Sequence, residues 1–203
     1  EIEGVSSLRP VEVKVIPDMI EAGTFLMAGA TLGEITLTDV DPSHLNIVLE
    51  KLDHAGCDLT IDDSTITIKQ NDCIRSTDIT TDVHPGFPTD LQAQWIALMS
   101  VADGTSVVTE TIYLDRFSHV PELVRLGANI SLENNIAIIR GQKSLTGAQV
   151  MSTDIRASAS LVIAALIADG RSDISRIYHI DRGYEQIEEK FKLLGADIFR
   201  EKE

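Results

Sequence analysis

The chain has 203 residues, 43% of them apolar, which is enough to bury a sizeable core as one large domain or two small ones. Its formal net charge of −15 excludes non-specific nucleic-acid binding, because no broad basic surface is available to follow a phosphate backbone. The longest apolar stretch, residues 161–168, is far too short to span a bilayer. We therefore expect a cytoplasmic protein with neither a nucleic-acid nor a membrane partner.

The cysteine and glycine patterns predict no metal and no cofactor. Cys57 and Cys73 lack metal-type spacing and suggest no disulfide framework, so we expect each to be a small buried or half-buried side chain. No glycine-rich phosphate loop is present. The chain begins at Glu1 rather than at a methionine and stops just after a strand-like segment, so we expect a piece of a longer protein.

Three apolar helical stretches recur along the chain, at residues 16–33, 88–104 and 153–170. Each begins with an aspartate behind a proline or threonine and ends at a glycine 14 to 16 residues later. Aspartate at the start and glycine just past the end are typical helix boundaries. The aspartates are Asp18, Asp90 and Asp154, and the glycines are Gly33, Gly104 and Gly170.

A strand, a second helix and short strands follow each of these stretches. The β-branched strands are expected at residues 34–40, 106–114 and 172–180. The second helices carry apolar stripes and end at Gly56, Gly127 and Gly195. The stripes are Leu45, Val48, Leu49 and Leu52; Val120, Leu123 and Val124; and Ile187, Phe191 and Leu194. Short strands are then expected at 57–61, 128–132 and 196–200, with hairpin partners at 65–69 and 137–141.

The sequence thus predicts three copies of a strand–helix–strand–helix–strand–strand unit, at about residues 11–72, 78–142 and 145–203. The first helix of each unit is apolar nearly all round, and such a helix must be buried on every side. We expect a single α/β domain over residues 1–203, with pseudo-threefold symmetry, three helices inside, and sheets and amphipathic helices around them.

Side-by-side helices place their N-termini together, and helix N-termini attract anions through free N–H groups and the helix dipole. Arg116, Arg156 and Arg182 lie in the segments expected at this end, and guanidinium groups suit carboxylate and phosphate recognition. Two alternatives stay open. The three aspartates serve as helix caps, and Arg116 and Arg182 pair with the adjacent Asp115 and Asp181 or with surface carboxylates.

Asp90 raises the sharpest question. It follows two prolines and a glycine in the stretch HPGFPTDLQAQ, residues 84–94, and opens a run of helix formers. Either it only caps the helix, or it is a carboxylate placed to move a proton. Capping is favoured by local physics, because all three units need a helix start.

Four long motifs resemble the UDP-N-acetylglucosamine 1-carboxyvinyltransferase family of enolpyruvyl transferases. They are HPGFPTDLQAQ (84–94), RFSHVPELVRLGA (116–128), LTGAQVMSTDIRASASLVIAALIADG (145–170) and RIYHIDRGYEQIEEKFKLLGADI (176–198). The resemblance implies transfer of enolpyruvyl from phosphoenolpyruvate to the 3′-hydroxyl of UDP-N-acetylglucosamine, the first committed step of peptidoglycan synthesis. It also implies an inside-out α/β barrel: two domains of three βαβαββ units each, with the active site between them.

The resemblance implies a role for seven residues of this chain. Asp90 is the expected general base next to the sugar hydroxyl, so it would both cap its helix and act in catalysis. Ile112 is expected to contact the substrate through its backbone, and Arg182 to bind the phosphoenolpyruvate carboxylate. The remaining expected cleft residues are Asp18, Arg116, Asp154 and Arg156.

The chain also departs from the family. Met19 stands where an arginine is usual, and Ser118 where a methionine is usual. The reactive cysteine of the family lies in a loop of the other domain, and neither Cys57 nor Cys73 matches its context. A lysine–asparagine pair of the family is missing as well. We therefore expect one domain of the enzyme, inactive alone, with a cleft face that is a plausible surface for homodimerisation.

Two other functions compete with this interpretation. The shikimate-pathway enolpyruvyl transferase shares the barrel, but its own signature motifs are not found in this chain. A non-catalytic binding or assembly module is an alternative of another class. The full reading frame separates the alternatives, because a neighbouring domain with the cysteine loop indicates an enzyme.

Overall fold

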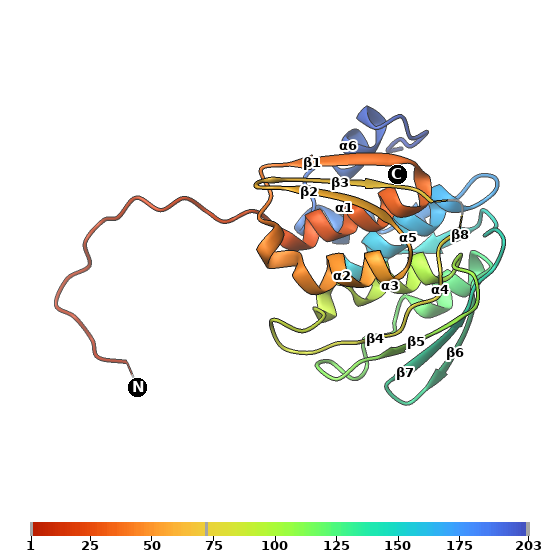
Figure 1. Ribbon diagram of the computed structural model, residues 1–203, viewed down its shortest axis with the longest axis horizontal. Helices are drawn as coiled ribbons and strands as arrows, with labels where there is room; N and C mark the ends of the chain where they lie inside the picture. The colour runs from red at the N-terminus through yellow and green to blue at the C-terminus, as the bar shows by residue number, and fades with distance from the viewer. Residues whose placement is uncertain (1, 72, 202–203) are drawn as a thin grey trace.

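The computed structural model describes residues 2–71 and 73–201 as an α/β body with an extended segment at its N-terminal end (Figure 1). The α-helices are α1 (Met19–Leu32), α2 (Asn46–His54), α3 (Gln92–Met99), α4 (Val120–Arg125), α5 (Ile155–Ile167) and α6 (Ile187–Leu193). The 3₁₀ helices are η1 (Pro42–Leu45), η2 (Thr89–Leu91) and η3 (Ile177–Arg182). The strands are β1 (Glu34–Thr38), β2 (Asp58–Asp62), β3 (Thr65–Lys69), β4 (Ile79–Thr80), β5 (Thr105–Thr109), β6 (Asn129–Glu133), β7 (Ile136–Arg140), β8 (Gln149–Met151) and β9 (Asp173–Ser175).

Three helices form the centre of the molecule, as predicted. α1, α3 and α5 pack against one another between the sheets (Figure 1). Every residue from Ala22 to Ala30 of α1 is buried, and so is every residue of α3. A helix buried all round has no polar face, which explains why the sequence shows long apolar runs rather than helical stripes at these positions.

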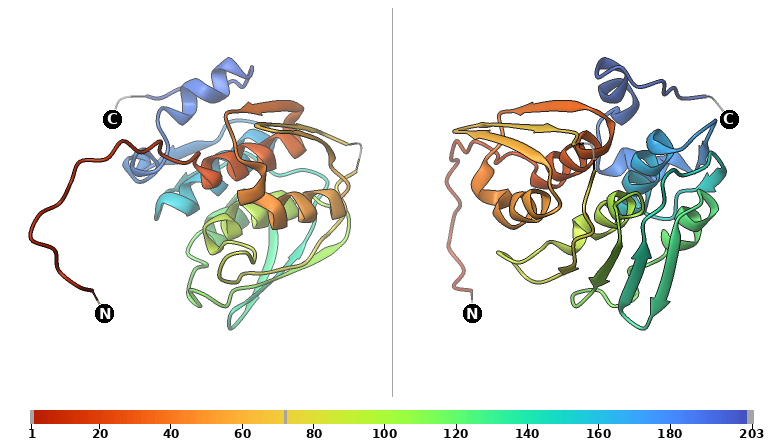
Figure 2. Two further views of the ribbon diagram at one scale, coloured as in Figure 1. Left: turned by 60° about the vertical axis from the view of Figure 1, so that its left-hand side comes forward. Right: turned by 45° about the vertical axis from the view of Figure 1, so that its right-hand side comes forward.

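The strands form three separate sheets around these helices. The orders are β1-β3-β2, β4-β5-β7-β6 and β8-β9. The first two sheets lie on opposite sides of the central helices (Figures 1 and 2). The middle strands β3 and β7 each bury alternate residues, such as Ile66 and Ile68 of β3, as the two-residue period of a strand requires. The fold is α/β with its helices inside, and among the described residues the sheets do not close into a barrel.

The full order of six elements is found in the second stretch, as β4, α3, β5, α4, β6 and β7. The first predicted unit, residues 11–72, lacks its leading strand: residues 11–16 are exposed and run away from the body (Figure 2). By contrast, β4 and β8 pair in parallel with the strand that follows their helix. The predicted strand at 196–200 is also wrong. Its counterparts β2 and β6 pair only with the middle strands β3 and β7, and no described residue supplies that middle strand for β9.

Several predicted boundaries need correction. β9 stops at Ser175, because Arg176 has φ of 56° and turns the chain into the 3₁₀ helix η3. β5 stops at Thr109, well before residue 114. α3 and α5 end at Met99 and Ile167, so Gly104 and Gly170 lie in the turns beyond these helices rather than at their ends.

The second helices follow the predicted stripes, with two exceptions. Most stripe residues are buried, but Val124 and Leu194 are 46% and 50% exposed. The glycines after these helices have φ of 85°, 93° and 95°, which is the left-handed conformation expected just past a helix end. They are Gly56, Gly127 and Gly195.

Cys57 is buried as predicted, and burial raises the pKa of its thiol to about 11. Cys73 is exposed, so the prediction of a buried or half-buried side chain is wrong there. Within residues 2–71 and 73–201, no cluster of three or more histidine, cysteine or acidic side chains has metal-binding geometry. In the same part of the chain, no helix combines the length and apolar character needed to cross a bilayer.

Gly141 is the position where the fold tolerates a side chain least. A Cβ atom there would overlap the backbone of Ala102, and the Gly141 N–H donates to the Gly104 carbonyl at 3.0 Å. We expect Gly141→Ala to lower the free energy of unfolding by about 1–3 kcal/mol, measured by urea unfolding, because neither backbone can move away cheaply. Gly4→Ala is the control, since nothing lies within 4 Å of a Cβ at that position. Equal stability of the two variants would show that this junction is not tightly packed.

Candidate active site

The starts of the three central helices meet at one end of the molecule. The Thr24 hydroxyl of α1 lies 2.8 Å from the Tyr184 hydroxyl, and Gln94 Nε2 of α3 donates to Thr24 Oγ1 at 3.1 Å. These three side chains are buried, and burial raises the pKa of Tyr184. Gly23 of α1 packs directly against the side chain of Leu91 in η2. The convergence inferred from the repeat is therefore present.

Asp154 caps α5, as predicted. Its Oδ1 accepts from the N–H groups of Arg156 and Ala157 at 2.8 and 2.9 Å, and its Oδ2 accepts from the Ser118 hydroxyl at 3.2 Å. Burial favours the neutral acid, but the hydrogen bonds from Ala157, Arg156 and Ser118 outweigh it and lower the pKa of Asp154. The cap thus joins α5 to the segment that precedes α4. Asp18 caps α1 in the same way, accepting from Ile20 and Glu21 at 2.8 and 3.1 Å.

Asp90 does not cap its helix, so that prediction is wrong. Pro88 occupies the N-cap position of η2, which places Asp90 inside the first turn, where its side chain makes no capping hydrogen bond. Instead, Asp90 Oδ1 lies 2.9 Å from Arg116 Nη2 and 3.3 Å from Arg156 Nε. Two of the three predicted arginines therefore hold one carboxylate.

Arg116 is fixed by several contacts in addition to Asp90. Its Nη1 donates to Thr89 Oγ1 at 3.0 Å, its carbonyl accepts from Gln92 Nε2 at 3.2 Å, and its guanidinium lies 6.0 Å from the ring centre of Tyr113. It does not pair with the adjacent Asp115, so that half of the alternative is wrong, but it does pair with a partly exposed carboxylate, that of Asp90. A guanidinium held at several points keeps a fixed position and can orient a carboxylate.

Arg182 ends η3 and is exposed. Gly183 next to it packs against Ile155, at the start of α5 and beside Arg156. The alternative pairing of Arg182 with Asp181 is also wrong, because Asp181 accepts from Arg200 at 2.7 and 3.0 Å. Within residues 2–71 and 73–201, no carboxylate pairs with Arg182, which leaves its guanidinium open to an anionic ligand.

Ile112 lies in the bend after β5 and is 44% exposed. Its backbone N–H donates to Glu110 Oε1 at 2.8 Å. A backbone contact from Ile112 to a ligand therefore has to use the carbonyl oxygen.

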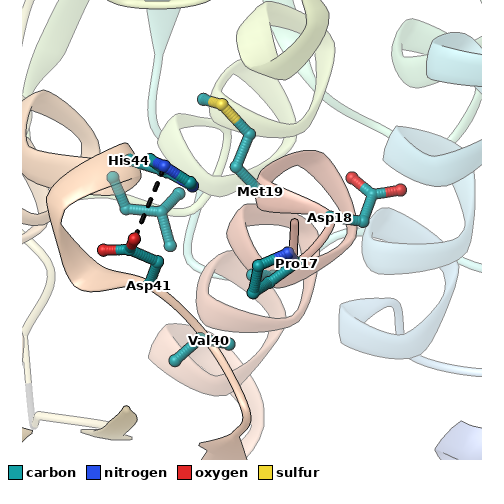
Figure 3. A pocket seen from close by; sticks show the side chains of 8 residues that line it. Pro17, Asp18, Met19, Val40, Asp41 and His44 are labelled. Carbon is teal, nitrogen blue, oxygen red and sulfur yellow. Dashed lines mark ion pairs between the residues drawn. The ribbon is translucent and has the colours of Figure 1, made fainter. Parts of the chain in front are cut away.

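Asp18 stands apart from the other predicted site residues. Its carboxylate bonds only to the first amides of its own helix. It borders a shallow depression together with Asp41 and His44, whose side chains lie 3.5 Å apart on the far side of Met19 (Figure 3). This depression is too narrow to admit a water molecule. A wider hollow of about 470 Å³ lies at the other end of the central helices, lined by Thr31, Val101 and Ile167 among others, and contains none of the predicted site residues.

Sequence analysis missed Glu110 and Thr89, which contact the site residues directly. Glu110 is fully buried, and Thr89 bonds both to it and to Arg116. The signal that could have found Glu110 is its register: Ser106, Val108 and Glu110 share the inward side of one strand and its extension, and a charged residue in that series is unusual.

The chemistry that the cluster can perform depends on which of its polar atoms make no hydrogen bond within the described chain. Both guanidiniums bind Oδ1 of Asp90, and no described residue donates to Oδ2. A carboxylate oxygen that is fixed in direction but unpaired can accept a hydrogen bond, and then a proton, from a ligand hydroxyl. The free guanidinium of Arg182 and the N-terminus of α5 favour an anion nearby.

The chain matches known proteins along nearly its whole length. The family model for EPSP synthase (3-phosphoshikimate 1-carboxyvinyltransferase) matches residues 1–191. The chain belongs to this family. It is 54% identical over 202 residues to the UDP-N-acetylglucosamine 1-carboxyvinyltransferase of Myxococcus xanthus, and 54% identical over 200 residues to that of Desulfosudis oleivorans. The alignments cover 99% and 98% of this chain but 48% of each relative, so the chain spans about half the length of these family members.

Solved structures of other members have the same fold. The enolpyruvyl transferase NikO from Streptomyces tendae superposes with a TM-score of 0.86 at 29% identity, over 93% of this chain and 45% of its own. EPSP synthase from Acinetobacter baumannii superposes with a TM-score of 0.69 at 16% identity, over 93% of this chain and 44% of its own. These matches confirm the predicted α/β enolpyruvyl transferase fold.

His119 connects this site to the pH dependence of stability. It is fully buried, and burial lowers its pKa from 6.5 to about 4, with Asp154 raising and Arg116 lowering it by smaller amounts. In the unfolded chain, His119 therefore binds a proton below pH 6.5, whereas in the folded chain it binds one only below about pH 4. We expect the free energy of unfolding to fall as pH is lowered through this window, by up to about 1.4 kcal/mol per pH unit.

Urea unfolding between pH 7 and pH 4 measures this slope. His119→Gln removes the titrating group and should flatten the curve over that window, whatever its effect on absolute stability. Asp154 also makes the free energy of unfolding fall with falling pH, but only at lower pH. Its pKa in the folded chain is lowered, so its stabilising effect is lost only below the ordinary pKa of a carboxyl group. An unchanged slope in the variant would rule out His119 as its source.

Proposed function

We propose that this chain is one domain of an enzyme that transfers enolpyruvyl from phosphoenolpyruvate to the 3′-hydroxyl of UDP-N-acetylglucosamine. The names of relatives more than half identical to the chain support this reaction. The observation that carries it is Asp90, which lies closest through Oδ1 to both Arg116 and Arg156, while Oδ2 accepts no hydrogen bond from the described residues.

Asp90 is the general base in this proposal. Its Oδ2 takes the proton of the sugar hydroxyl as the hydroxyl oxygen bonds to the enolpyruvyl carbon, and phosphate leaves. Arg116 and Arg156 keep the carboxylate in one orientation, which matters because proton transfer needs hydrogen-bond distance and alignment. The Ile112 carbonyl faces the nucleotide sugar, and Asp154 keeps the start of α5 in place.

Arg182 binds the carboxylate of phosphoenolpyruvate. Its guanidinium has no carboxylate partner within the described chain, and a fork of N–H donors fits a carboxylate or phosphate in two-point contact. Asp18 contributes to the rim of the cleft on the side of α1, where Met19 replaces the usual arginine and makes the rim less positive.

The rest of the enzyme completes the site. Asp90 is 39% exposed here, and a reaction centre that works by electrostatics gains from the exclusion of water. We therefore assign residues 1–203 to one domain of three units and the reactive cysteine to the part of the enzyme outside this chain. The same assignment implies that the protein acts in the cytoplasm and takes part in cell-wall synthesis. It also implies that the protein uses no cofactor or metal and has no nucleic-acid or membrane partner. The open cleft face also makes a homodimer of the isolated chain a testable outcome.

The shikimate-pathway reaction ranks below this proposal. The EPSP synthase structure shares the fold at 16% identity, whereas the relatives named for the nucleotide-sugar reaction are 54% identical. A purely structural module ranks lower still, because it would not need an unpaired Arg182 or an Asp90 held away from its helix cap.

We expect the 203-residue chain alone to have no transferase activity, because half of the cleft and the reactive cysteine are absent. Phosphate release from phosphoenolpyruvate in the presence of UDP-N-acetylglucosamine measures this. The two-domain protein is the positive control. Turnover by the isolated chain would refute the assignment of essential chemistry to the other domain, and size-exclusion chromatography of the same sample tests the homodimer.

Asp90→Asn in the two-domain protein separates catalysis from folding. We expect the variant to lose turnover by about 10²-fold or more, because the amide cannot accept the hydroxyl proton. Stability should change by only about 1 kcal/mol, since Asp90 is no helix cap and its ion pairs are partly exposed. A variant with normal turnover would eliminate the general-base role, and Asp41→Asn, on the far side of α1, is the matched control.

A further inference from the structure

Glu110 departs from the repeat that organises the rest of the fold. It lies six residues after Gly104, and the residues at the same distance from Gly33 and Gly170 are Asp39 and Arg176. Asp39 and Arg176 are exposed and have φ of 56°, so the chain leaves those strands through a left-handed residue. Glu110 is fully buried and has no such conformation.

The Glu110 carboxylate accepts four hydrogen bonds. Oε1 accepts from Thr81 Oγ1 at 2.7 Å and from the N–H groups of Ile112 and Tyr113 at 2.8 and 3.0 Å. Oε2 accepts from Thr89 Oγ1 at 2.8 Å. A buried carboxylate is costly to maintain unless its acceptor sites are filled in this way, and an apolar side chain in the same inward register would avoid the cost.

These four bonds join two parts of the candidate site. On one side, they fix the bend that carries Ile112. On the other side, Thr89 Oγ1 accepts a hydrogen bond from Arg116 at 3.0 Å, and Arg116 forms an ion pair with Asp90 at 2.9 Å. The same bend leads to Arg116, whose N–H donates to the carbonyl of Tyr113 at 2.9 Å.

Resting on the function proposed above, we propose that Glu110 is a positioning residue for the transfer reaction. It sets the direction of the Ile112 carbonyl and, through Thr89 and Arg116, the orientation of the Asp90 carboxylate. It touches no substrate itself. Asp90 and Glu110 are thus two residues at which the second unit departs from the other two, and they are connected by hydrogen bonds through Thr89 to Arg116 and by the Arg116–Asp90 ion pair.

The decisive variant is Glu110→Gln in the two-domain protein. The amide oxygen can keep the three donors now on Oε1, so the domain should fold, but the amide N–H₂ then faces Thr89 and reverses that bond. We expect kcat/KM for UDP-N-acetylglucosamine to fall by about tenfold to a hundredfold, because Asp90 is misaligned. The KM for phosphoenolpyruvate should stay unchanged, because the bonds of Glu110 do not extend to Arg182.

Two further variants sharpen the test. Thr89→Val removes the Thr89–Glu110 hydrogen bond from the other side. If both residues act through one path, the double variant should be as active as the less active of the two single variants. Asp39→Asn, at the matching place in the first unit, is the control and should leave the kinetics unchanged. Wild-type kinetics in Glu110→Gln, a changed KM for phosphoenolpyruvate, or losses that multiply in the double variant would overturn the proposal.

Hydrogen exchange separates this proposal from the proposed function. Glu110→Ala removes every acceptor, so the amides of Ile112 and Tyr113 should exchange faster than in the wild type. If that variant does not fold, the kinetics of Glu110→Gln decide. A wild-type two-domain protein without transferase activity would overturn the proposed function, whereas unchanged exchange in Glu110→Ala would overturn the role of Glu110 itself.

Discussion

The mutual burial of three apolar helices is the constraint on which the rest of this structure depends. α1, α3 and α5 have no polar face, so they can only pack against one another and against the inner sides of the sheets. Their common direction gathers three helix starts at one end. The backbone N–H groups and arginines found there give an acidic protein one surface suited to anions, which the fold creates without a dedicated loop motif.

The candidate site is built where the repeat is broken. Asp18 and Asp154 serve as caps, as the symmetry of the units requires, and their carboxylates are occupied by backbone amides. In the second unit, a proline takes the cap position and frees Asp90 for two arginines, while Glu110 turns inward to hold the neighbouring bend. Functional positions commonly give up a locally favourable interaction that their structural counterparts keep.

The three sheets differ in their pairing within the described chain. The sheet of β8 and β9 lacks the middle strand that β3 and β7 provide in the other two sheets, and residues 11–16 do not pair with β1. The chain covers about half the length of its relatives. Val11, Val13 and Val15 are exposed in the segment 11–16, and β9 pairs only with β8 within the described chain.

Sequence alone determined the fold class and the three buried helices, because apolar runs, β-branched strands and glycine boundaries are local signals, and it pointed to Asp90, Arg116 and Arg156 but not to Thr89 or Glu110. It could not determine that Asp90 leaves its cap, that Arg116 and Arg156 hold it while Arg182 stays unpaired, or that Glu110 is buried. Those outcomes depend on a two-residue offset between the expected cap, Asp90, and the observed cap, Pro88, and on distances between segments far apart in the chain. Pairing of strands at 11–16 and 196–200 failed for a related reason: a strand forms only where tertiary structure supplies its hydrogen-bonding partner.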